Sequence, residues 1–171
     1  ASSVETLRLT GASTITLGTD AASAGIVNVI TGNGATSITN SNGVTLNVNA
    51  AALANNTVLA LVGSSVEVVT GLIGNITASA LTGALTVTTG NATDNSIAII
   101  TGSAATSITA SGASDVVTVT ATALAQNTAL TLAGSAAGTV TGLVGDITAS
   151  SLTGALTVTT GDATDDGISI A

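Results

Sequence analysis

The sequence contains no Phe, Trp, Tyr, Met, Cys, Pro or His among its 171 residues. Without His, Cys, Tyr and Lys it lacks the usual bases and activated nucleophiles of enzymes, and the usual ligands of transition metals. Because Cys is absent, the chain can form no disulfide bond. Its hydrophobic residues, 45% of the chain, are therefore only Ala, Val, Ile and Leu. We expect no enzymatic activity, and a core of small and branched aliphatic side chains.

Positive charge is almost absent as well, since Arg8 is the only cationic side chain against nine acidic ones, for a net charge of −8. A nucleic-acid-binding protein neutralises phosphates with Lys and Arg, so this class of partner is excluded. Docking on an anionic membrane is disfavoured for the same reason. Thr, Ser, Asn and Gly interrupt every apolar run, and none approaches the roughly 20 residues of a membrane-spanning helix. We therefore expect no membrane insertion.

The main feature of the sequence is a long stretch that occurs twice, at 70–99 and again at 141–170. The two copies align without gaps at an offset of 71 and are identical at 23 of 30 aligned positions. A long repeat at a fixed offset is typical of arrays and solenoids.

Shorter matches extend this repeat over the whole chain. Leu9–Ala12 matches Leu81–Ala84 at an offset of 72, and Ile30–Gly32 matches Ile100–Gly102 at an offset of 70. We interpret residues 1–171 as one continuous array, with a partial repeat at 1–69, a complete repeat at 70–140 and a partial repeat at 141–171. The small changes of offset indicate insertions in turns. Because the sequence begins with Ala and both ends fall inside a repeat, we expect it to be a processed or excised segment.

Each unit is predicted to consist mostly of strands. Runs such as 84–88, 116–120 and 128–132 alternate apolar residues with Thr, and Gly, Asn, Asp and Ser separate them at turn-like intervals. The alanine-rich pieces 50–54 and 121–125 are too short for stable helices and are interpreted as bends or brief strands. We predict an all-β fold, a β-solenoid or parallel β-roll with coils of about 18–20 residues and roughly four coils per unit. Tandem Ig-like β-sandwiches are the alternative, because evenly spaced strands in 71-residue units also suit them.

Two nine-residue segments, 101–109 and 110–118, have the outline of a β-roll nonapeptide, and 147–166 has the composition of flanking repeats. In these segments the chain resembles the repetitive regions of secreted bacterial RTX-type adhesins and related S-layer proteins. The resemblance implies a calcium-binding β-roll on a cell surface. The calcium motif of that family carries a Gly-Gly pair, which is missing here, and only Asp115 falls in register with its Asp.

The candidate metal ligands are acidic residues in glycine-flanked turns. They are Asp162, Asp165 and Asp166 in GDATDDG, Asp94 in the equivalent GNATDNS, and Asp115. Closely spaced oxygen ligands suit Ca²⁺, which is the only cofactor that the sequence suggests. The alternative is that Asp and Asn stabilise these turns by hydrogen bonding to the nearby backbone.

Thr-x-Thr elements suggest a third function. They occur at Thr14/Thr16, Thr86/Thr88, Thr118/Thr120 and Thr157/Thr159. A flat threonine array on a β-solenoid could bind ice, although Thr is also a common residue on the exposed face of strands. An ice-binding array should recur in every coil, whereas these four recur once or twice per unit.

Taken together, the sequence predicts an extracellular structural protein, a subunit of a surface layer, an adhesin stalk or a self-assembling filament. Solenoid ends expose strand edges unless they are capped, so we expect head-to-tail stacking of identical chains, with the cell surface or matrix as a further partner. A calcium-dependent adhesion module and an ice-binding β-solenoid are the alternatives.

Overall fold

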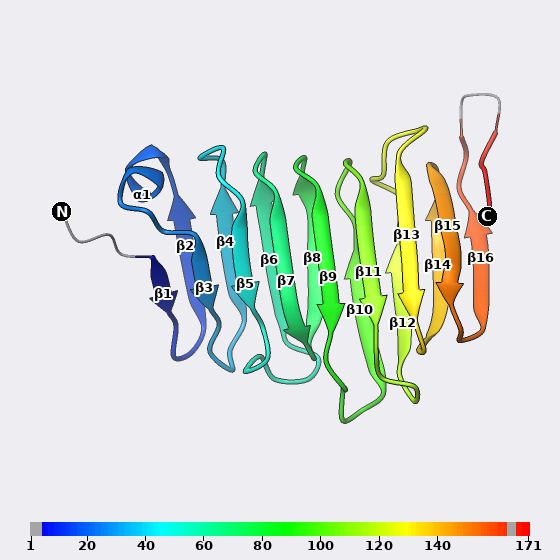
Figure 1. Cartoon of the computed structure of the whole chain (residues 1–171), viewed down its shortest axis with the longest axis horizontal. Helices are drawn as coiled ribbons and strands as arrows, with labels where there is room; N and C mark the ends of the chain where they lie inside the picture. The colour runs from blue at the N-terminus through cyan, green and yellow to red at the C-terminus, as the bar shows by residue number, and fades with distance from the viewer. Residues whose placement is uncertain (1–4, 164–166) are drawn as a thin grey trace.

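The computed structural model describes residues 5–163 and 167–171, and it shows a β-solenoid of about seven turns. Two parallel sheets of eight strands each face one another, and the chain alternates between them (Figure 1). All pairings between the named strands are parallel. Ig-like sandwiches are built from antiparallel sheets, so that alternative is wrong.

The strands with odd numbers form one sheet, here called the odd sheet, and those with even numbers form the even sheet. The odd sheet contains β1 (Thr6–Arg8), β3 (Asn28–Ile30), β5 (Leu46–Asn49), β7 (Glu67–Leu72), β9 (Leu85–Thr89), β11 (Thr106–Ala110), β13 (Ala129–Gly134) and β15 (Asp146–Leu152). The even sheet contains β2 (Ser13–Leu17), β4 (Thr36–Asn40), β6 (Val58–Gly63), β8 (Asn75–Leu81), β10 (Ser96–Ile100), β12 (Val116–Thr120), β14 (Ala137–Leu143) and β16 (Leu156–Thr160).

The core consists of aliphatic side chains stacked in register from coil to coil. Alternate residues of each strand point inward, as the apolar-Thr alternation predicts. One inward row of the odd sheet runs through Leu7, Val29, Val48, Val69, Val87, Ile108 and Leu132. A matching row of the even sheet runs through Leu59, Ile76, Ile99, Val119, Val140 and Val158. Because each side chain packs on one of similar size, the core needs no aromatic residue.

The coils differ in length more than the sequence predicts. Leu130 pairs with Thr106 in the coil before it and with Ile147 in the coil after it. The coil from 106 to 130 is therefore clearly longer than the coil from 130 to 147. The variation lies in the turns, which absorb insertions while the strands keep their register.

The 71-residue unit contains seven strands and therefore three and a half coils, not the four that we expected. β8 begins at Asn75 and the equivalent strand β15 begins at Asp146. Because seven is odd, the equivalent strands belong to opposite sheets, as β8 lies in the even sheet and β15 in the odd sheet. Successive units are therefore related by a half-turn about the solenoid axis.

The backbone confirms this relation in detail. Pairs of residues 71 apart share a positive φ: Asn56 and Asn127, Gly63 and Gly134, Gly71 and Gly142. The register shifts between β6 and β8 and between β7 and β9 recur between β13 and β15 and between β14 and β16. The half-turn therefore changes which sheet a strand joins without changing its local conformation.

The alanine-rich pieces 50–54 and 121–125 form turns, as predicted. The single helix of the described residues, α1 (Thr19–Ser23), lies in the turn after β2 and was not predicted from the sequence. Residues 90–94 occupy the equivalent place in the next unit and form no helix. A five-residue helix is a local feature of this turn, and it leaves the strand order unchanged.

Close contact between stacked turns predicts the effect of one substitution. A Cβ added to Gly83 would lie 1.9 Å from the carbonyl oxygen of Ser65 in the coil below, whereas one added to Gly18 would meet nothing within 4 Å. We expect Gly83→Ala to lower the free energy of unfolding by about 2–3 kcal/mol, because backbone must move. Gly18→Ala should change it by less than about 0.5 kcal/mol, or raise it slightly. Urea denaturation of both variants measures this, and equal stabilities would contradict the turn packing.

Candidate functional surfaces and acidic turns

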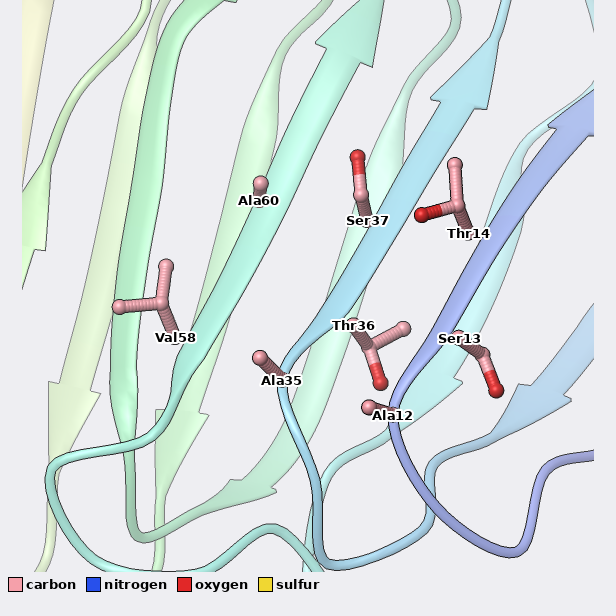
Figure 2. A pocket seen from close by; sticks show the side chains of 8 residues that line it. All are labelled: Ala12, Ser13, Thr14, Ala35, Thr36, Ser37, Val58 and Ala60. Atoms are coloured by element: carbon pink, nitrogen blue, oxygen red, sulfur yellow. The ribbon is translucent and has the colours of Figure 1, made fainter.

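The outer face of the even sheet carries two parallel rows of side chains along the solenoid. The first row begins with Ala12, Ala35 and Val58 and the second with Thr14, Ser37 and Ala60. Figure 2 shows these small side chains around a shallow open hollow across β2, β4 and β6, which Ser13 and Thr36 also line. The hydroxyl groups of Ser13 and Thr36 donate to the backbone carbonyls of Gly11 and Gly34, so they serve the local turns.

Towards the C-terminal end, most of the outward residues of the even sheet are threonines, with Val116 and Ala137 as exceptions. Three successive strands place six of them in register: Thr118, Thr139 and Thr157 in one row, and Thr120, Thr141 and Thr159 in the other. We call this set the threonine grid. Ala98 and Ile100 of β10 end it on one side. With general strand dimensions, its spacing is about 4.8 Å between strands and about 6.6 Å along each strand.

The grid changes the interpretation of the Thr-x-Thr elements. A further element, Thr139/Thr141, was not identified from the sequence and lies between Thr118/Thr120 and Thr157/Thr159 in the same sheet. The elements therefore recur in each of three successive coils, and the expectation of one or two per unit is wrong here. Thr86/Thr88 lies apart from them in the odd sheet, because the half-turn of the repeat moves it to the other face.

Asp94 takes part in a contact between two loops. The long loop between β5 and β6 reaches the loop after β9, where Asn56 Nδ2 donates to Asp94 Oδ2 at 2.7 Å. The other carboxylate oxygen accepts the N–H of Ser96 at 3.3 Å. With its amide oxygen turned toward them, Asn55 accepts from the N–H groups of Thr93 and Asp94, both at 3.1 Å. Both oxygens of Asp94 thus have partners within the protein, which is the turn role that the sequence left open.

Asp115 is buried, with 1% of its surface exposed, rather than lying in an open turn. Its Oδ2 accepts the N–H of Ala92 in the previous coil at 3.2 Å, while Oδ1 has no protein partner. A Cβ on Gly112 would lie 2.1 Å from Oδ2, so the glycine leaves room for this carboxylate.

The candidate ligands do not converge in the described part of the chain. Asp94 and Asp115 belong to turns that follow odd strands, whereas the exposed Asp162 follows the even strand β16 at the opposite edge. Residues 5–163 and 167–171 contain no group of three or more acidic side chains that could hold a metal ion. Asp165 and Asp166 lie outside the described residues. The two copies of the acidic turn therefore cannot stack on one another, since the half-turn places them at different edges.

A buried polar pair escaped the sequence analysis. Asn40 at the end of β4 donates through Nδ2 to Glu67 Oε1 at the start of β7, at 2.9 Å, and both side chains are at most 1% exposed. Burial raises the pKa of Glu67 to about 7, and the hydrogen bond from Asn40 opposes this rise only in part. Strand alternation carried a signal, because Glu67 has the same parity as the inward Val69.

Comparison with known protein families, with curated protein sequences and with solved structures finds no match to this chain. Among the described residues, no helix has the length and apolarity needed to cross a membrane.

The calcium hypothesis for the acidic turn predicts a stability difference. Ca²⁺ that binds only the folded chain would raise its melting temperature, and a saturating ligand at 100 times its Kd contributes about 2.7 kcal/mol. Asp162→Ala combined with Asp165→Ala should abolish this rise. The control Asp94→Ala should retain it, because the carboxylate of Asp94 is already bonded to Asn56 and Ser96. Identical melting curves of the wild type in Ca²⁺ and in chelator would contradict the hypothesis.

Proposed function

We propose that the chain is an extracellular structural protein without catalytic activity, a rigid section of a surface layer, an adhesin stalk or a self-assembling filament. It would extend by stacking strands of one copy on strands of the next. The observation that supports this most directly is the pair of parallel sheets that continue through eight strands each around one aliphatic core.

The open edges combine unpaired backbone with apolar side chains. Within the described residues, β1, β2 and β16 pair on one side only, whereas β15 also forms a parallel bridge through Ile147 to Ile170. The inward Ile15 of β2 and the inward Leu156 and Val158 of β16 are half-buried, whereas their counterparts in central coils are buried. Such an edge is a template for a further strand.

The polarity of the solenoid favours head-to-tail contact. All strands are parallel, so the two ends present different surfaces, and a contact between different surfaces extends a filament rather than closing a dimer. The distribution of charged residues also favours head-to-tail contact. Residues 1–30 hold Glu5, Arg8 and Asp20, whereas 141–171 hold four aspartates and no cation. Contact between two C-terminal ends is therefore disfavoured by repulsion.

Head-to-tail stacking predicts that purified chain forms long uniform fibres in negative-stain electron microscopy. Val158→Lys should leave isolated short rods, because an inward-pointing charge in the apolar row prevents stacking at the edge. Thr157→Lys is the matched control, since its side chain is exposed on the outer face of the same strand, and it should still form fibres.

Imaging in Ca²⁺ and in chelator distinguishes a calcium-dependent adhesion module from a filament that forms without calcium. Fibres that form only in Ca²⁺ would favour the calcium-dependent module. Circular dichroism verifies that each variant is folded. Short rods of the wild type in both conditions would overturn self-assembly.

The threonine grid supports ice binding as a second candidate function. The grid presents threonine side chains in register over three strands, with no charged residue among its six members, although the hydroxyl group of Thr141 donates to the carbonyl oxygen of Val119. Such a surface can order water in a lattice of similar spacing. This candidate requires no assembly and no cation.

Ice binding predicts thermal hysteresis of the purified chain. Thr139→Tyr, in the middle strand of the grid, should abolish most of the hysteresis because its ring interrupts the flat surface. Thr109→Tyr in β11 places the same ring on the outer face of the odd sheet and should leave the hysteresis unchanged. Absence of hysteresis in the wild type would refute this function, and equal loss in both variants would exclude the grid as its site.

A further inference from the structure

The Asn40–Glu67 pair links the two sheets at one corner of the solenoid. Asn40 ends β4 of the even sheet, and Glu67 begins β7 of the odd sheet. Asn40 Nδ2 also lies 3.3 Å from the carbonyl oxygen of Val44. The second carboxyl oxygen, Glu67 Oε2, is buried without a hydrogen-bond partner in the protein. The site thus satisfies one oxygen of the carboxyl group and leaves the other in an apolar surrounding.

No charged group faces this carboxyl. Glu67 is the only ionisable side chain between Asp20 and Asp94, so β4, β5, β6, β7, β8 and β9 contribute no other titratable group. The single cation of the chain, Arg8, is exposed on β1. An ionised Glu67 would therefore lie in the core with one amide donor and no counter-ion, which is a costly arrangement.

The repeat shows that the fold does not need this pair. At the equivalent positions of the next unit, Ala110 replaces Asn40 and Gly138 replaces Glu67. Ala110 and Gly138 line a small enclosed apolar space, so the half-turn relation brings them together as well. Both polar partners are absent there together, so neither is left buried without the other. The pair is thus an additional feature of the first unit.

The pair also holds two stacked turns in place. The carbonyl oxygen of Asn40 accepts the N–H groups of Ser64 at 3.1 Å and Ser65 at 3.2 Å. Ser65 Oγ in turn accepts the N–H of Gly43 at 3.0 Å. A displacement of Asn40 or Glu67 therefore loosens the turn at 41–45 and the turn at 64–66 together. In the second unit, Ala110 accepts from Ser135 and Ala136 in the same way, at 2.8 and 3.2 Å.

We propose that the Asn40–Glu67 pair is a pH-sensitive contact that keeps these two turns closed while Glu67 is protonated and lets them open when Glu67 ionises. A neutral carboxyl group can remain in the core with one hydrogen bond. An ionised one needs water at Oε2, and water reaches this atom only when the turns separate.

The direction of the pH dependence follows from burial. The pKa of Glu67 is about 7 in the closed structure, compared with 4.5 for a solvated glutamate. The closed state therefore binds the proton more tightly than the open state. Its stabilisation is complete below about pH 4.5 and is lost as the pH rises through about 7.

Hydrogen exchange of the full chain at pH 5 and pH 8 tests this proposal, with rates corrected for intrinsic exchange. The opening equilibrium at 41–45 and 64–66 should rise on the order of fifty-fold between these pH values. The corner formed by Ala110, Ser135 and Ala136 contains the same backbone bonds with Gly138 in place of Glu67. Its turn holds the buried carboxyl group of Asp115, so the control for the carboxyl group of Glu67 is a variant of Glu67 itself.

Two variants isolate the carboxyl group. Glu67→Gln retains an oxygen that can accept from Asn40 but cannot ionise, so its protection should be equal at both pH values. Asn40→Ala combined with Glu67→Gly reproduces the pair found in the second unit and should fold without pH dependence. Protection of the wild type that is independent of pH would overturn the proposal, and so would an equal change in Glu67→Gln.

Discussion

The structure depends on the hydrogen-bonded stacking of parallel strands, which sets the distance from one coil to the next at about 4.8 Å. At that distance every inward side chain must pack on the one below it. A row such as Val29, Val48, Val69 and Val87 satisfies this condition, because equal side chains stack without gaps. A single aromatic ring in such a row would need a matching space in both neighbouring coils. The absence of Phe, Trp and Tyr is thus a consequence of the fold.

The same stacking determines what remains available for function. The interior is filled along the length of the described solenoid, so chemistry is confined to the two outer faces, the turns and the ends. The outer faces carry almost no charge, and Thr, Ser, Asn and Ala dominate them. Such surfaces suit repetitive contacts with other strands or with ordered water better than recognition of a small molecule.

Much of the fold could be predicted from the sequence. The alternation of apolar residues with Thr identified strands, and the fixed offset identified a solenoid. The odd number of strands in each unit could not be predicted. Residues 73–74 form a turn so short that β7, β8 and β9 are difficult to separate by composition. The half-turn of the repeat then determined what else was missed. It moved Thr86/Thr88 and Thr157/Thr159 to opposite faces and placed Asn91 and its equivalent Asp162 at opposite edges. Residues that look equivalent in the sequence are thus not neighbours in space.

An odd number of strands per unit also links the length of the array to its orientation. Duplication or loss of one unit by unequal recombination would turn everything beyond that point to the opposite side of the rod. Duplication of two units would restore the original side. A lineage that changes copy number one unit at a time would therefore alternate the side on which a distal module is displayed, without altering a single contact within the units. Selection for the direction of display would appear as a preference for even or odd copy numbers.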